Sequence, residues 1–144
     1  MEEKVRRYTK AFPARLGMLY SILLWIRQHA KEANFSKKDL RKVELACEEA
    51  LMNVIRHAYK NQRGEVELQI HVLDHKEIEI VIKDYGPSFN PLLVGEKINR
   101  TALLEERREG GLGIFLMQKY MDEVNYLRED PYNVLTLKKI KTSP

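Results

Sequence analysis

Hydrophobic positions along the chain follow a helical period first and a strand period later. Between Ala14 and Ala33 they recur at the three- and four-residue spacing of an amphipathic helix. A second helix with the same spacing is expected to begin after Ser36, a candidate N-cap residue with Asp39 three positions on. This helix should run to about Tyr59, so the first part of the chain is predicted to be mainly helical.

Strands are predicted where apolar and polar residues alternate, at residues 66–72 and 78–82. A short strand is expected at residues 5–12, and a closing hairpin at 124–127 and 134–139. Because the strands are grouped in hairpins rather than alternating with helices, the pattern favours an α+β fold. We expect a two-layer sandwich in which a mostly antiparallel, mixed sheet carries helices on one face.

Residues 88–109 show no firm periodicity beyond a candidate short helix at 101–107. Loops of this length in a compact domain are often functional, so a lid is expected at about residues 88–110. No repeat or linker divides the chain, and residues 1–144 are predicted to form a single domain.

The composition of the chain limits the classes of protein to which it can belong. The 25 basic residues are interleaved with 21 acidic ones, so the net charge of +4 does not indicate direct nucleic-acid binding. No apolar run approaches the roughly 20 residues of a membrane helix, and no secretory signal is predicted. The single cysteine, Cys47, lies on the apolar stripe of the second helix and is expected in the core. A reducing cytoplasm is the expected location.

A first polar cluster lies on the second predicted helix. Glu49 and Asn53 are one turn apart and therefore share a face of this helix. The Asn53 amide oxygen is a ligand type that suits Mg²⁺, and the Glu49 carboxylate could accept a proton. An ordinary solvated helix face is the alternative interpretation of the same two residues.

A second cluster, Asp84-Tyr85-Gly86-Pro87, follows a strand. It can be an ordinary tight turn, or a turn in which Asp84 accepts a hydrogen bond from an exocyclic amine. In the second case Gly86 would let a flat ring approach the backbone.

A third cluster, residues 110–113, reads Gly-Gly-Leu-Gly and precedes an apolar helix. Uncovered N–H groups at such a helix start can bind phosphate, and Arg107 and Arg108 immediately precede it. A plain helix entry is the alternative. The motif fits neither a Rossmann fingerprint nor a P-loop, because no strand precedes it.

The order and spacing of the three clusters resemble those of the Bergerat-fold (GHKL) ATPases. Within that superfamily, residues 44–59 are similar to the Glu-Ala-x-x-Asn-x-x-x-His-x-Tyr helix of the anti-sigma-factor serine-protein kinases. Residues 84–89, 110–117 and 121–124 also look like signatures of this group. The resemblance covers residues 5–139.

The resemblance implies a role for each candidate residue. Asn53 would bind Mg²⁺, Asp84 would recognise the amino group of adenine, and Gly86 would lie against the adenine ring. Glu49 would be the general base for a serine hydroxyl. Thr136, in the last strand, is a candidate for adenine contact through water, although it also reads as an ordinary strand residue. The residues implied to contact the nucleotide from the lid and the glycine turn are Arg108, Gly110, Gly111, Leu112 and Gly113.

The same resemblance implies cofactors and partners. ATP and Mg²⁺ are the expected cofactors. An anti-anti-sigma factor would supply the substrate serine, a sigma factor would be the second partner, and the kinase would be a homodimer. Two alternatives remain at this point: an ATP-binding partner-switch regulator that transfers nothing, and a histidine-kinase-like ATPase domain.

Overall fold

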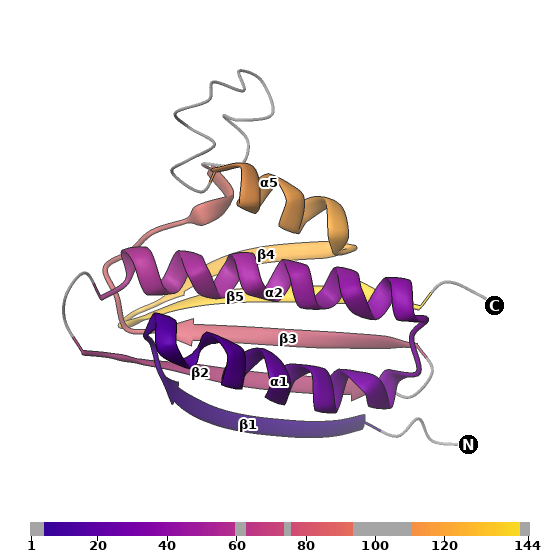
Figure 1. Cartoon of the computed structure of the whole chain (residues 1–144). Coiled ribbons are helices and arrows are strands. Elements are labelled where there is room, and N and C mark those ends of the chain that lie inside the picture. The colour runs from indigo at the N-terminus through magenta and orange to yellow at the C-terminus, as the bar shows by residue number, and fades with distance from the viewer. Residues whose placement is uncertain (1–4, 60–62, 74–75, 94–110, 142–144) are drawn as a thin grey trace.

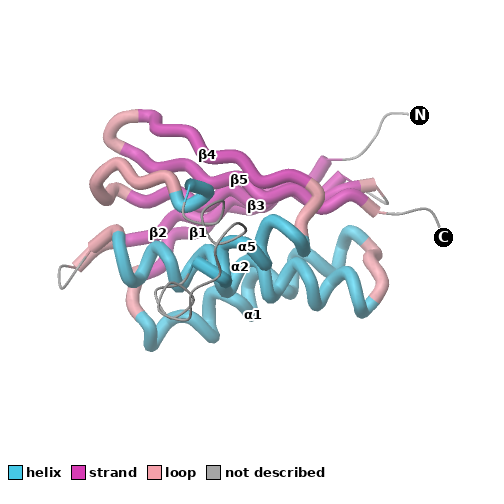
Figure 2. The backbone as a smooth tube through the Cα atoms, turned by 90° about the horizontal axis from the view of Figure 1, so that it is seen from above, coloured by secondary structure: helices cyan, strands magenta, loops and turns pink. Residues whose placement is uncertain are grey.

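The computed structural model describes residues 5–59, 63–73, 76–93 and 111–141. They form two layers, with the helices on one face of a single sheet (Figures 1 and 2). The predicted α+β sandwich is confirmed. The helix candidate at residues 101–107 lies outside the described residues, whereas residues 91–93, expected to be irregular, are helical.

The helices and strands follow one another in the expected order. They are β1 (Val5–Pro13), the 3-10 turn η1 (Leu16–Met18), α1 (Leu19–Ala30), the 3-10 turn η2 (Lys31–Ala33), α2 (Lys37–His57), β2 (Glu65–Leu73), β3 (Glu77–Asp84), α5 (Gly111–Tyr120), β4 (Glu123–Glu129) and β5 (Tyr132–Ile140). The helix predicted at residues 14–33 is divided into η1, α1 and η2. It ends at Asn34, whose φ of 59° is left-handed and stops the helical hydrogen bonding.

The sheet has five strands in the order β1-β2-β3-β5-β4, and every pairing among the described strands is antiparallel. The expectation of a mixed sheet is therefore corrected to an antiparallel one. The hairpin of β4 and β5 joins the sheet with β5 beside β3. Asn133 of β5 consequently lies directly opposite Asp84 of β3.

The core lies between α1, α2 and α5 and the sheet. Ser36 caps α2 as predicted, because its Oγ accepts a hydrogen bond of 3.1 Å from the backbone N of Asp39. The buried stripe of α2 includes Val43, Cys47 and Leu51, which confirms Cys47 as a core residue. Inward residues of β2 and β3 meet this stripe, and burial of each such side chain contributes about 1.5–3 kcal/mol.

Candidate nucleotide site

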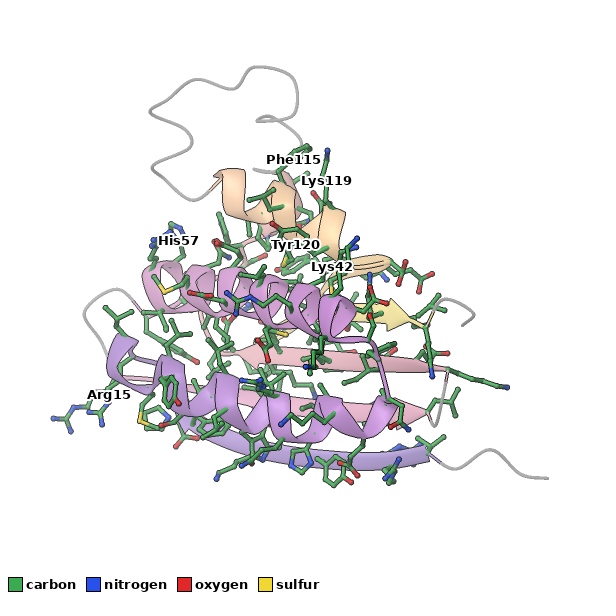
Figure 3. All side chains as sticks on the ribbon, turned by 45° about the vertical axis from the view of Figure 1, so that its right-hand side comes forward. Arg15, Lys42, His57, Phe115, Lys119 and Tyr120 are labelled. Atoms are coloured by element: carbon green, nitrogen blue, oxygen red, sulfur yellow. The ribbon has the colours of Figure 1, made fainter. Side chains whose placement is uncertain are left out.

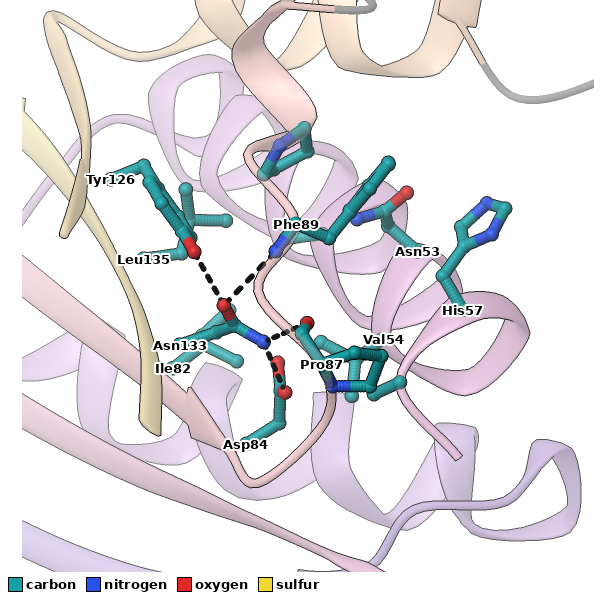
Figure 4. Close-up of a pocket in the computed structure, with 13 residues that line it drawn as sticks. Asn53, Val54, His57, Ile82, Asp84, Pro87, Phe89, Tyr126, Asn133 and Leu135 are labelled. Atoms are coloured by element: carbon teal, nitrogen blue, oxygen red, sulfur yellow. Dashed lines mark hydrogen bonds between the residues drawn. The ribbon is translucent and has the colours of Figure 1, made fainter. Parts of the chain in front are cut away.

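A cavity lies between the last turns of α2, the inner face of the sheet and the segment that follows β3 (Figure 4). Its described lining is mainly apolar, with a few polar groups, as is usual for small-molecule sites. The lining residues are Ala50, Asn53, Val54, His57, Ala58, Ile82, Asp84, Pro87, Phe89, Pro91, Tyr126, Asn133 and Leu135. Two of the predicted site residues, Asn53 and Asp84, are therefore brought together.

The helix period directs Asn53 and His57 into this cavity from α2 (Figure 4). His57, one turn after Asn53, stacks on Phe89 with 5.2 Å between ring centroids and an interplanar angle of 29°. This contact joins the end of α2 to the segment after β3.

Asp84 ends β3 with its side chain on the inner face of the sheet, and only 6% of the residue is exposed. Its Oδ1 accepts hydrogen bonds from the backbone N of Gly86 at 2.8 Å and from Nδ2 of Asn133 at 2.9 Å. Among the described residues no group donates to Oδ2. A buried carboxylate that keeps one free acceptor oxygen beside a cavity can receive an N–H from a bound ligand.

Asn133 is the residue of this site that the sequence did not reveal. Its Nδ2 also donates to the carbonyl oxygens of Gly86 at 3.3 Å and Pro87 at 3.0 Å. Its Oδ1 accepts from the Tyr126 hydroxyl and from the backbone N of Phe89 (Figure 4). Asn133 is only 6% exposed and therefore has its polar atoms satisfied inside the protein.

The expectation for Thr136 is not supported by the structure. Successive strand residues point to opposite faces of a sheet, and Leu135 and Leu137 are core residues. Thr136 consequently lies on the other face, away from the helices and the cavity. Asn133, three positions earlier and on the inner face, is the polar residue of β5 that lines the cavity.

Gly86 is required by close packing. A Cβ at this position would come within 2.7 Å of the Ala58 Cα and 2.8 Å of the Ala58 carbonyl oxygen. The turn therefore lies directly on the end of α2. Gly86 is not among the described residues that line the cavity, so its contact with adenine stays a prediction.

The glycine-rich segment meets α2 at Glu49. Gly111 and Leu112 are the first residues of α5, and Gly113 follows in its first turn. A Cβ at Gly113 would overlap Oε2 of Glu49. The carboxylate predicted to be catalytic and the predicted phosphate-binding helix start are therefore in direct contact. Arg107, Arg108 and Gly110 lie outside the described residues.

The surroundings of Glu49 raise the pKa of its carboxyl above the ordinary value of 4.5. Partial burial is the main cause, the neighbouring charge of Glu48 adds to it, and Arg56 opposes it. Burial disfavours the charged form, so this carboxylate holds a proton more readily than an exposed glutamate does. A raised pKa is the property that a general base needs for accepting a proton near neutral pH.

The donor set decides how a metal ion could be held. Across the described residues no group of three or more His, Cys, Asp and Glu is arranged to hold one. The Asn53 amide oxygen, with Glu49 one turn before it on α2, fits a cation that takes most of its ligands from phosphate and water. Mg²⁺ is commonly bound in this way.

Comparison with known proteins identifies the class to which this fold and site belong. Residues 12–139 match the histidine kinase-like ATPase domain family. The crystal structure of the RsbU and RsbW domains of Rv1364c from Mycobacterium tuberculosis has the same fold, with a TM-score of 0.66 at 11% identity. That match covers 96% of this chain and 33% of the larger one. None of the helices in the described part of the chain is long and apolar enough to cross a membrane.

Two relatives define the family more narrowly. The serine-protein kinase RsbW of Staphylococcus aureus (strain MSSA476) is 33% identical, over 90% of this chain and 84% of the relative. The serine-protein kinase RsbW of Bacillus mycoides (strain KBAB4) is 28% identical, over 98% of this chain and 89% of the relative. The chain belongs to the histidine kinase-like ATPase domain family and, within it, to the serine-protein kinases RsbW. As a member it is a protein kinase that uses ATP.

Proposed function

We propose that this kinase exchanges two protein partners. It phosphorylates a serine of an anti-anti-sigma factor, and it sequesters a sigma factor. The contact between Glu49 and Gly113 carries the proposal, because it joins a general base to a helix start suited to phosphate. Kinship with the serine-protein kinases RsbW supports the same reaction.

Each site residue then has a defined task in the transfer. The cavity binds adenine, and Asp84 accepts a hydrogen bond from the adenine amino group. Asn53 would hold Mg²⁺, and the bound ion would neutralise phosphate charge. The first turn of α5, with Gly111 and Gly113, directs N–H groups at the phosphates.

The transfer itself needs an oriented hydroxyl more than a strong base. The serine Oγ attacks the γ-phosphorus as its proton passes to the Glu49 carboxylate. The bond between the γ-phosphorus and the bridging oxygen breaks, and that oxygen leaves with ADP. Arg108, Gly110 and Leu112 complete the proposed nucleotide contacts. We propose that Arg108 and Gly110 belong to a lid at about residues 88–110, within a single kinase domain formed by residues 1–144.

We further propose that the kinase works as a homodimer in the cytoplasm, where ATP and sigma factors are found. The family resemblance supports the homodimer. Sedimentation of the purified chain with and without ATP tests it, and a monomer under both conditions would contradict it.

The kinase proposal predicts that Glu49→Gln and Asn53→Ala fail at different steps. Glu49→Gln removes the proton acceptor and should lower the rate of phosphoserine formation about 10²- to 10⁴-fold, while Mg-ATP affinity stays within about twofold. Asn53→Ala removes a metal ligand and should weaken Mg-ATP binding itself. Calorimetry measures binding, and mass spectrometry of the partner measures transfer.

Glu44→Gln is the matched control, because it removes another carboxylate of α2, one that forms ion pairs with Arg27 and Arg41. It should phosphorylate the partner at close to the wild-type rate near neutral pH. Wild-type transfer by Glu49→Gln would remove Glu49 from the mechanism. A wild-type protein that binds Mg-ATP and never phosphorylates the partner would favour a regulator without phosphotransfer.

A further inference from the structure

The turn between β3 and the following segment is held by two side chains from outside the cavity. The Tyr59 hydroxyl accepts a hydrogen bond from the backbone N of Tyr85 at 2.8 Å and donates one to the Glu65 carbonyl at 2.6 Å. On the other side, Nη1 of Arg128 donates to the Gly86 carbonyl at 2.8 Å. Neither Tyr59 nor Arg128 is among the described residues that line the cavity.

Each of these residues is itself fixed by its surroundings. The Tyr59 ring lies so close to Gly64 that a Cβ there would overlap it, so the start of β2 sets the position of the hydroxyl. Arg128 stands opposite Asn133 in the sheet register, and its Nη2 pairs with Asp130 at 3.0 Å. The helix end, the sheet and the last hairpin therefore meet at two consecutive residues of the turn.

The position of Tyr85 and Gly86 determines the orientation of the Asp84 carboxylate. Oδ1 is occupied by the N–H of Gly86 and by Asn133, and this leaves Oδ2 for a ligand. If Tyr85 or Gly86 moves, the Gly86 N–H moves with it and the carboxylate turns. A hydrogen bond from a ligand amine to Oδ2 weakens steeply when its geometry is lost.

We propose that Tyr59 and Arg128 are positioning residues for recognition of the nucleobase amine. They hold the main chain of Tyr85 and Gly86 so that Oδ2 of Asp84 faces the exocyclic amino group of adenine. The proposal rests on the proposed function, because it requires that ATP binds in this cavity. It separates a recognition role for the two side chains from a general contribution to folding.

The test compares ATP with purine riboside triphosphate, which lacks the exocyclic amine. In Tyr59→Phe and in Arg128→Gln, affinity for ATP should fall about three- to tenfold, the effect of one hydrogen bond. Affinity for purine riboside triphosphate should change less than about twofold, because no amine is left to be recognised. Titration calorimetry with Mg²⁺ gives both dissociation constants on one preparation, so a loss of folded protein cancels in their ratio.

Three further variants sharpen the result. Arg128→Lys keeps a cationic donor and should recover part of the preference for ATP. Tyr85→Phe removes an exposed hydroxyl and keeps the backbone N that Tyr59 binds, and Glu129→Gln changes an exposed side chain next to Arg128 in β4. Both should keep the wild-type ratio of the two affinities.

Several results would overturn the proposal. Equal losses for both nucleotides in Tyr59→Phe and Arg128→Gln would mean that the two residues only support the fold. Wild-type affinities for both nucleotides in both variants would also refute the positioning role, although the proposed kinase function would stand. Absence of ATP binding by the wild-type protein would instead refute the proposed function, and the positioning role with it.

Discussion

At the scale of the residue, Gly113 is a point of close approach between α2 and α5. The Glu49 carboxylate occupies the space where any other residue would have its Cβ. Helix propensity alone favours alanine over glycine inside a helix by about 1 kcal/mol. The glycine is therefore explained by its neighbour and not by the helix in which it stands.

Gly113→Ala should accordingly keep the fold and lose activity. The added methyl group displaces the Glu49 carboxylate, so phosphoserine formation is expected to fall at least about tenfold, as for a misplaced general base. Gly17→Ala is the matched control, since a Cβ there meets nothing within 4 Å. Steady-state kinetics and circular dichroism check both variants, and full activity of Gly113→Ala would contradict the assigned contact.

At the scale of the element, periodicity predicted which segments are strands, but not which strands become neighbours. Asn53 and Asp84 were found because each stands in a local motif. Asn133 has no such motif, and its place beside Asp84 arises from the register between β3 and β5, which lie far apart in sequence. The misplaced expectation for Thr136 has the same origin, since one position along a strand changes the face of the sheet.

The network that ties β1 to the end of α1 is expected to make stability depend on pH. Glu32 accepts hydrogen bonds from Tyr8 and Arg6, both at 2.7 Å, and pairs with His29 at 3.2 Å. Burial by itself raises the pKa of its carboxyl, but the bonds from Tyr8 and His29 and the Arg6 charge outweigh burial and hold the pKa below 4.5. A lowered folded-state pKa means that the ionised form stabilises the fold.

This contribution is present above the unfolded-state pKa and is lost as pH falls through the lower folded-state value. The free energy of unfolding should therefore decrease as the solution is acidified below about pH 4.5. The decrease should be shallower in Glu32→Gln than in the wild type. Urea titrations at successive pH values measure it, with the exposed Glu129→Gln as the control. Identical slopes for Glu32→Gln and the wild type would contradict the role of this network.

At the scale of the whole molecule, the site is assembled from parts that are distant in the chain. Glu49 and Asn53 come from α2, Asp84 from β3, Gly113 from α5 and Asn133 from β5. The outer surface of α5 faces away from the sheet, where Lys119 lies over the Phe115 ring at 4.9 Å (Figure 3). Because the site residues come from four different elements, nucleotide binding should stabilise the folded domain as a unit.

Cys47 offers a direct measure of this stabilisation. It is the only cysteine, it is fully buried, and burial raises the pKa of its thiol to about 12. It should react with a thiol reagent only when the core opens, and saturating ATP should slow labelling in proportion to its concentration over its dissociation constant. Asp130→Cys in a Cys47→Ala background is the exposed control, and equally fast labelling of native Cys47 would contradict the prediction.

The place of β5 between β3 and β4 also bears on how the domain is made. A ribosome releases β5 last among the described strands, yet it is the strand that completes the hydrogen bonding of β3. Until then the nascent chain carries an open edge at β3, next to the apolar side chains of Ile78, Ile80 and Ile82. Asp84 also lacks Asn133 during that interval. Competence to bind nucleotide should therefore arise only after β5 has left the ribosome, together with protection of this edge from aggregation.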